Sequence, residues 1–267
     1  MSEYLTTHEL AGLLHVSPAT VRRWADSGLL PAIRTAGGHR RFSREVAERI
    51  ARQPATGGGE EVDRWVDLLV SPGAMMDVDA ALLSERHQRG SWHAVATALG
   101  RVLERLGDRW ERNELTVVQE HLAAARLERS LARLAEALPV RLGGPRALLF
   151  TPEGEGHTLG LSLVELVLRE WGWPTLFVGR EAPVRHVLSY LPVGGVGAVL
   201  VSASIYSRAE TLRAFVDEFA PACAAAAVPL VVGGRGPWPE HLPSGEVIRE
   251  FRGLRDHLAK LDLARAG

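Results

Sequence analysis

The sequence is poor in cysteine and in long apolar runs. Cys223 is the single cysteine among 267 residues, so no disulfide can form within the chain, which favours a reducing compartment. No apolar run reaches the roughly 20 residues of a membrane-spanning helix. The first residues lack the basic start and long apolar core of a signal peptide. We therefore expect a cytoplasmic protein without a membrane partner.

Several familiar catalytic patterns are also missing. We find no Ser/His/Asp triad, no phosphate-binding loop and no zinc-type cysteine cluster, and we therefore expect no enzymatic activity. The net charge of −1 excludes a general polyanion binder. Charge is unevenly spread, however, because residues 1–52 hold eight arginines against five acidic residues. A basic module on a neutral body predicts nucleic-acid binding by one domain only.

Periodicity and breakers predict an α plus α/β multidomain protein. Residues 1–52 contain short helical patterns and a Gly-Gly turn. Residues 53–60 form a linker rich in glycine, and residues 61–140 show the periodicity of a four-helix bundle. Residues 141–267 alternate short apolar runs with helical patterns, which predicts a Rossmann-like, flavodoxin-like domain with a parallel sheet. Its expected strands are 147–150, 175–178, 198–201 and 228–232, and its expected helices are 158–171, 182–191 and 207–226.

The first 52 residues predict a winged helix-turn-helix. Thr7 is expected to cap one helix, and Ser17 a second that begins at Pro18 and stops before Gly28. A tight turn with a basic arm follows at residues 36–42, which predicts a wing anchored by Phe42. The second helix of such a motif lies in the major groove of DNA.

The stretch "SPATVRRWADSGLLPAIRTAGGHRRF" resembles the recognition helix and wing of the MerR family of regulators. The resemblance implies binding to double-stranded operator DNA as a dimer. The glycine-rich linker follows too soon for the long dimerising coiled coil of many members, so oligomerisation must come from the rest of the chain. The residues expected to contact DNA are Arg22, Arg23, His39, Arg40 and Arg41.

Three small or polar motifs follow predicted strands in the last part of the chain. His157 stands in a glycine-containing loop, two residues after Glu155, an arrangement that suits axial metal ligation with the carboxylate on the second imidazole nitrogen. Ser202-Ala203-Ser204 and Gly233-Gly234 end two other strands. Since the carboxyl ends of parallel strands meet at one edge of a sheet, we expect the three motifs to lie together.

These motifs resemble the cobalamin-binding fold of methionine synthase and the mutases, with its D-x-H-x-x-G, S-x-L and G-G signature. The resemblance implies that His157 is the lower axial ligand of cobalt and that Glu155 orients it. It further implies that the nucleotide tail lies along the sheet edge, held by Gly160, Ser202, Gly233 and Gly234. Glu155 and Ser204 depart from the signature, replacing the usual Asp and the usual Leu or Thr.

A further motif, Trp-x9-Glu-His, lies in the predicted bundle as Trp110, Glu120 and His121. Together with the MerR-like and cobalamin-like parts, it resembles the CarH class of light-responsive, cobalamin-dependent repressors. The resemblance implies adenosylcobalamin as the cofactor, with these three residues on the adenosyl side. It also implies a homotetramer in the dark that blocks transcription and falls apart when light removes the adenosyl group.

One neighbour departs from the light-sensing pattern. Relatives can capture cobalt after photolysis with a histidine beside the tryptophan, but here that position is Glu111. His93 or His121 could take its place, or no second histidine binds. Three other functions stay open: a light-independent cobalamin sensor, a corrinoid methyl carrier, and a regulator with a second chromophore, for which Cys223 is a conceivable attachment point.

Overall fold

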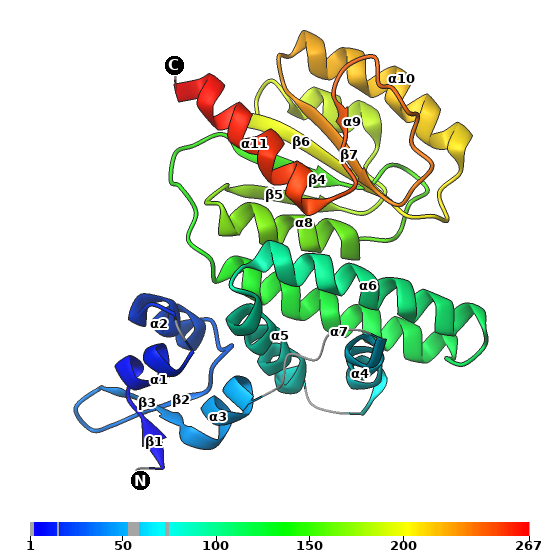
Figure 1. The fold of residues 1–267 in the computed structure, drawn as a ribbon. Helices are drawn as coiled ribbons and strands as arrows, with labels where there is room; N and C mark the ends of the chain where they lie inside the picture. The colour runs from blue at the N-terminus through cyan, green and yellow to red at the C-terminus, as the bar shows by residue number, and fades with distance from the viewer. Residues whose placement is uncertain (1–2, 15, 53–58, 73–74, 267) are drawn as a thin grey trace. The chain divides into compact units, whose positions relative to one another are not determined.

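The structure is a computed structural model that describes residues 3–14, 16–52, 59–72 and 75–266. It forms two compact units, residues 1–138 and residues 139–267, and each is described by itself. The first unit contains the helix-turn-helix and a helical bundle, and the second contains a parallel sheet with helices on both faces (Figure 1). The fold class predicted from the sequence is confirmed. Residues 53–58 of the predicted linker lie outside the described residues.

The N-terminal module is a winged helix-turn-helix. Its small sheet has the antiparallel order β1-β3-β2. Ser17 caps α2 by accepting a hydrogen bond from the Thr20 amide at 3.1 Å, with Pro18 as the first helical residue, as predicted. The elements are β1 Tyr4–Leu5, α1 Thr7–Leu13, α2 Pro18–Asp26, β2 Ala32–Arg34, β3 Arg40–Ser43 and α3 Arg44–Arg52.

The cap of α1 differs from the prediction by one residue. Thr6, not Thr7, is the N-cap: its hydroxyl accepts from the Glu9 amide at 3.2 Å, and the Glu9 carboxylate accepts from the Thr6 amide at 2.7 Å. This reciprocal capping box satisfies two amides that the first helical turn leaves without partners. Thr7 cannot replace Thr6, because the glutamate must stand three residues after the cap.

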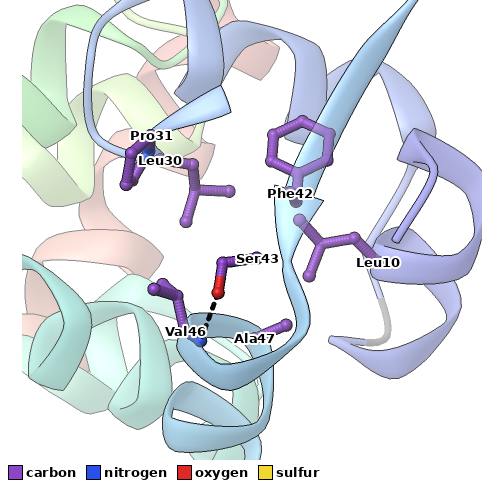
Figure 2. A pocket seen from close by; sticks show the side chains of 7 residues that line it. All are labelled: Leu10, Leu30, Pro31, Phe42, Ser43, Val46 and Ala47. Atoms are coloured by element: carbon purple, nitrogen blue, oxygen red, sulfur yellow. Dashed lines mark hydrogen bonds between the residues drawn. The ribbon is translucent and has the colours of Figure 1, made fainter. Parts of the chain in front are cut away.

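Phe42 is buried and anchors the wing, as expected. Figure 2 shows its ring beside Leu10 of α1, with Leu30 from the turn after α2 and Ala47 of α3 closing the core. The space left between them is about 10 Å³, no larger than one water molecule. The wing is therefore held to the helices by close packing.

Residues 59–136 form the predicted four-helix bundle. The helices are α4 Gly59–Val70, α5 Met75–Arg89, α6 Trp92–Glu111 and α7 Val117–Glu136. Because α4 begins at Gly59, the last two residues of the predicted linker are helical, which corrects that boundary. Side chains at helical spacing fill the core, among them Val66, Leu99, Leu127 and Leu131. Arg133 forms an ion pair with the buried Asp79 at 2.5 Å, and this pair joins α7 to α5.

The second unit has the strand order β5-β4-β6-β7-β8, all parallel. Numbered within the unit, this is the 2-1-3-4-5 order of flavodoxin-like folds. The predicted strands and helices are present, while β8 and the C-terminal helix α11 were not predicted. The elements are β4 Arg146–Phe150, α8 Leu159–Glu170, β5 Thr175–Gly179, α9 Val184–Tyr190, β6 Val196–Ala203, α10 Ala209–Ala225, β7 Leu230–Gly234, β8 Glu246–Val247 and α11 Phe251–Ala266.

The central strands alternate their side chains between two apolar cores. Phe150 and Val201 pack against α9 and α10, where Phe215 and Phe219 are stacked. Leu149 and its neighbours on the other face pack against α8 and α11. Burial on both faces explains why these strands read as unbroken apolar runs in the sequence. In the part of the chain that the structure describes, no helix combines the length and apolar character needed to cross a membrane.

Candidate functional site

The loop between β4 and α8 forms the centre of the candidate site. β4 has β5 on one side and β6 on the other, because the chain runs from β4 to β5 and then crosses back past β4 to β6. Ligands of such sheets bind beyond the carboxyl ends of the strands at this reversal point. The Thr151 hydroxyl donates to the Glu155 carbonyl at 2.6 Å and accepts from the Glu181 amide at 3.0 Å. These bonds fix the loop that carries Glu155 and His157.

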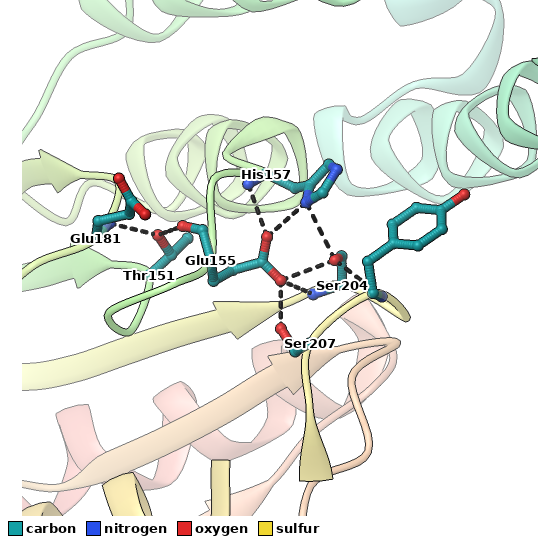
Figure 3. A network of polar contacts seen from close by, with 7 residues as sticks. Thr151, Glu155, His157, Glu181, Ser204 and Ser207 are labelled. Carbon is teal, nitrogen blue, oxygen red and sulfur yellow. Dashed lines mark hydrogen bonds and ion pairs between the residues drawn. The ribbon is translucent and has the colours of Figure 1, made fainter. Parts of the chain in front are cut away.

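Glu155 and His157 form the pair that the sequence predicts. The Glu155 Oε1 atom lies 2.6 Å from His157 Nδ1 and accepts from the His157 amide at 2.8 Å (Figure 3). Glu155 is only 3% exposed, whereas the side chain of His157 is 58% exposed. With Nδ1 donating to a carboxylate, Nε2 is the nitrogen that would bind a metal. The replacement of Asp by Glu therefore does not prevent the hydrogen bond.

The second oxygen of Glu155 is bound from β6. Oε2 accepts from the Ser204 amide and the Ser204 hydroxyl, both at 2.7 Å, and from the Ser207 hydroxyl (Figure 3). Burial alone raises the pKa of this carboxyl group. The hydrogen bonds from His157, Ser207 and the Ser204 amide outweigh burial and lower the pKa of Glu155 to about 2. Glu155 is consequently a carboxylate at any physiological pH.

The residues expected to hold the nucleotide tail converge beside this pair. Ser202 pairs with Gly233 across β6 and β7. A Cβ atom added at Gly160 would lie 3.1 Å from the Ser202 hydroxyl oxygen, and one added at Gly234 would lie 3.0 Å from it. The glycines at 160 and 234 therefore leave a narrow cradle around the Ser202 hydroxyl. Glycine at 233 and 234 is also required by the protein itself, because an added Cβ would lie 2.6 Å from the Ile248 carbonyl oxygen at position 233 and 2.4 Å from the Ala203 carbonyl oxygen at position 234.

Trp110, Glu120 and His121 belong to the other unit. Trp110 lies in the last turn of α6 and is 37% exposed, and Glu120 and His121 lie in the first turns of α7. The short connection between the two helices places these turns at the same end of the bundle. The Glu120 carboxylate lies 2.6 Å from His121 Nδ1. The apolar residues Val117, Val118 and Leu122 are exposed on the same turns.

The predicted DNA-contacting residues fall into two groups. Arg22 on α2 and His39 in the wing turn are exposed. Arg23, Arg40 and Arg41 are half-buried, and Arg40 forms an ion pair with Asp26 at the end of α2. This ion pair fastens the wing to the second helix. The sequence analysis missed Arg34, an exposed arginine on β2 whose strand position could have identified it.

Three residues of the cobalamin-like site were also missed. Thr151 fixes the loop, Ser207 donates to Glu155, and the Tyr206 ring lies against His157. Ser207 follows Ser202 by five residues, in a stretch rich in small polar residues just beyond a predicted strand. That position was the available signal for it.

The fold and the site define a protein in which a winged helix-turn-helix is joined to a bundle and a flavodoxin-like domain with a carboxylate-bound histidine. Comparison with known families agrees. The protein-family model described as a helix-turn-helix domain matches residues 4–51. The family model described as a B12 binding domain matches residues 55–135, the region of the helical bundle. The domain content and the homology below support the predicted cobalamin cofactor.

The chain is homologous to two repressors of Myxococcus xanthus. It is 31% identical over 122 residues to the HTH-type transcriptional repressor CarA, which covers 46% of this chain and 42% of that protein. It is 35% identical over 91 residues to the HTH-type transcriptional repressor CarH, which covers 33% of this chain and 30% of that protein. The matched parts thus span less than half of either relative.

A solved structure shares the fold. The monomethylamine corrinoid protein of Methanosarcina barkeri superposes with a TM-score of 0.56 at 16% identity, over 76% of this chain and all of that one. At this identity the likeness shows the fold alone. This fold therefore occurs in a protein named for a corrinoid.

Proposed function

We propose that the chain is a cobalamin-dependent transcriptional repressor that uses adenosylcobalamin as a light-responsive switch. The observation that carries the proposal is the Glu155–His157 pair at the reversal point of the sheet, in a chain that also holds a helix-turn-helix domain. Its homology to two transcriptional repressors supports the regulatory role. We propose that it acts in the cytoplasm and is not an enzyme.

The residues of the second unit fit a cobalamin. His157 presents an imidazole whose tautomer is fixed by an anionic carboxylate, which is how proteins orient a histidine toward a metal. Ser202 and its neighbouring glycines provide a cradle that side chains would fill. In our proposal His157 is the lower ligand, Glu155 and Ser204 hold it, and Gly160, Ser202, Gly233 and Gly234 hold the nucleotide tail. Adenosylcobalamin supplies a cobalt ion and a cobalt–carbon bond that light cleaves.

The bundle residues take the opposite side of the cofactor in this proposal. Trp110, Glu120 and His121 line the adenosyl group, and the exposed apolar side chains Val118 and Leu122 beside them gain from being covered. We further propose that the protein is a homotetramer on its operator in the dark. Loss of the adenosyl group in light then separates the subunits and releases the DNA.

The N-terminal module binds the operator in our proposal. The exposed residues Arg22 and His39 extend from the second helix and the wing turn, where the motif contacts bases and phosphates. Arg23, Arg40 and Arg41 complete the basic surface. Arg40 combines DNA contact with its ion pair to Asp26.

The deciding experiment compares purified wild type with His157→Ala. We measure the absorption spectrum with adenosylcobalamin, the elution volume and the affinity for operator DNA, each in the dark and after green light. We expect wild type to bind the cofactor, and we expect its assembly and its DNA binding to occur only in the dark. We expect His157→Ala to lose tight cofactor binding. Cofactor-dependent DNA binding that is identical in dark and light would instead favour the light-independent sensor. Failure of wild type to bind any cobalamin would overturn the proposal.

A further inference from the structure

The turn after β6 contains a tyrosine that the proposed function does not use. The rings of Tyr206 and His157 have centroids 5.3 Å apart and planes inclined by 30°. Tyr206 is 49% exposed, so it is not a core residue that happens to touch the histidine. Aromatic rings whose centroids are roughly 4.5–7 Å apart are in favourable contact.

The backbone of Tyr206 is tied to the same network as the histidine. Its amide donates to the Ser204 hydroxyl oxygen at 3.2 Å, and that hydroxyl donates to Glu155 at 2.7 Å. Ser207, the next residue along the chain, donates to the same Glu155 oxygen. Tyr206 is thus flanked by two residues that hold the carboxylate, and these bonds fix its backbone beside His157.

A hydrogen bond at Nδ1 alone does not fix the direction of Nε2. The imidazole can tilt about that bond, and more than half of the side chain is exposed. A second contact on the ring removes this freedom. A ligand held in one orientation binds its metal more tightly because less rotamer entropy is lost.

We propose that Tyr206 is a positioning residue for His157, and that it strengthens cobalamin binding by fixing the imidazole orientation. The proposal rests on the proposed function, since it assumes that His157 binds cobalt. The contact with His157 is between the two rings, and a phenylalanine would keep it. Phenylalanine should therefore replace tyrosine at this position, whereas alanine should not.

The test compares Tyr206→Ala and Tyr206→Phe in the full chain, with Tyr190→Ala as a control for loss of a partly exposed tyrosine from the same unit. Circular dichroism checks that all three fold. In the cofactor-free proteins, three-bond couplings from NMR report whether the His157 side chain occupies one rotamer. Titration with hydroxocobalamin, followed by absorption, gives the dissociation constant.

We expect Tyr206→Ala to average the His157 couplings and to weaken hydroxocobalamin binding by about tenfold, the lower end for loss of an outer contact to a metal ligand. Tyr206→Phe and Tyr190→Ala should behave as wild type. Unchanged couplings or unchanged affinity in Tyr206→Ala would overturn the proposal, as would equal loss in Tyr206→Phe. If His157→Ala binds hydroxocobalamin as wild type does, the proposed function fails, and the couplings still decide whether Tyr206 fixes the imidazole.

Discussion

Glu155 and Ser204, the two residues at which the sequence departs from the cobalamin signature it resembles, are bonded to each other. The Ser204 amide and hydroxyl both donate to Glu155 Oε2 at 2.7 Å. A leucine at position 204 could supply only the amide. The Ser204 hydroxyl, which a threonine would also supply, binds the longer carboxylate of Glu155, and that carboxylate still reaches His157. The two departures are best understood as one alternative way of holding the histidine.

Glu155→Gln should weaken binding of hydroxocobalamin by about 10- to 100-fold, as expected when the outer partner of a metal ligand is changed. The amide carries no charge, so it no longer stabilises a proton on His157 Nδ1, and its NH₂ group cannot accept from the serines. Affinity is measured by absorption titration. Glu153→Gln, an exposed position in the same loop, is the matched control and should match wild type. Equal affinities for all three proteins would show that Glu155 only shapes the loop.

Gly160→Ala should reduce cobalamin affinity without unfolding the protein. The only atom near an added Cβ at this position is the Ser202 hydroxyl oxygen, at 3.1 Å, and alanine is a better helix residue than glycine at the start of α8. The methyl group therefore enters the cradle beside Ser202 without a clash elsewhere that would unfold the protein. The control is Gly156→Ala, whose Cβ meets no atom within 4 Å. If Gly160→Ala binds hydroxocobalamin as tightly as the control, the tail does not lie in this cradle.

The sequence predicted the central strands well because each is apolar on both faces and bounded by turn residues. It missed α11, although Phe251, Leu254 and Leu258 recur at the three- and four-residue spacing of one helix face, so the signal was present in the sequence and was not used. It also missed β8, because a strand of two residues has no measurable alternation. A capping box needs the capping threonine three residues before the glutamate, and only Thr6 stands at that distance from Glu9. The sequence was sufficient to identify Thr6, but the prediction chose Thr7.

The site was predictable in part. The Glu155–His157 spacing was visible along the chain, and the convergence of Gly160 and Gly234 on Ser202 followed from strand ends meeting at one edge. Tyr206 could not be chosen from the sequence, and the signal for Ser207 was only its position just beyond a predicted strand. The roles of both residues depend on how the turn after β6 folds back over Glu155, which is a tertiary contact.

Arg22→Ala and Arg34→Ala should each weaken operator binding and lower its salt dependence. Each lost phosphate contact removes about one unit from the slope of log affinity against log salt concentration. Fluorescence anisotropy with operator DNA at several salt concentrations measures this slope. Arg64→Ala, an exposed arginine on α4, is the control. An unchanged slope in either wing or helix variant would place that arginine outside the DNA contact.

Cys223 should react with thiol reagents only when the second unit opens. It is fully buried in α10, and burial raises the pKa of its thiol to about 12 from 9.0. At pH 9 only about one thiol in a thousand is ionised in the folded chain. Because the folded pKa is raised, the associated stability is present below pH 9 and is lost as the pH rises through 12. Rapid labelling of the native protein by a disulfide reagent at pH 8 would contradict this burial and reopen Cys223 as a chromophore attachment point.

Trp110→Ala should uncouple the cofactor from assembly while leaving cobalamin bound. The residues proposed to hold the cofactor from below, His157 and the cradle around Ser202, all belong to the second unit, so the substitution leaves them intact. Trp110 belongs to the bundle, where its ring at the end of α6 is partly exposed, and the proposed function assigns it to the adenosyl side. A bulky adenosyl group should act on the bundle through this contact, and the bundle should in turn set the surfaces that join subunits.

Wild type should therefore elute as a larger oligomer only with adenosylcobalamin in the dark, and as a smaller species after green light. Trp110→Ala should bind adenosylcobalamin yet elute as the smaller species in both states. Trp65→Ala is not a suitable control, because Trp65 is a core residue bonded to Glu85; Leu142→Ala, at a fully exposed apolar position, is preferable. Gel filtration of the three proteins, dark and illuminated, decides the matter. If Trp110→Ala assembles and separates as wild type does, Trp110 contributes only to packing, and the proposal that light acts through the bundle loses its main support.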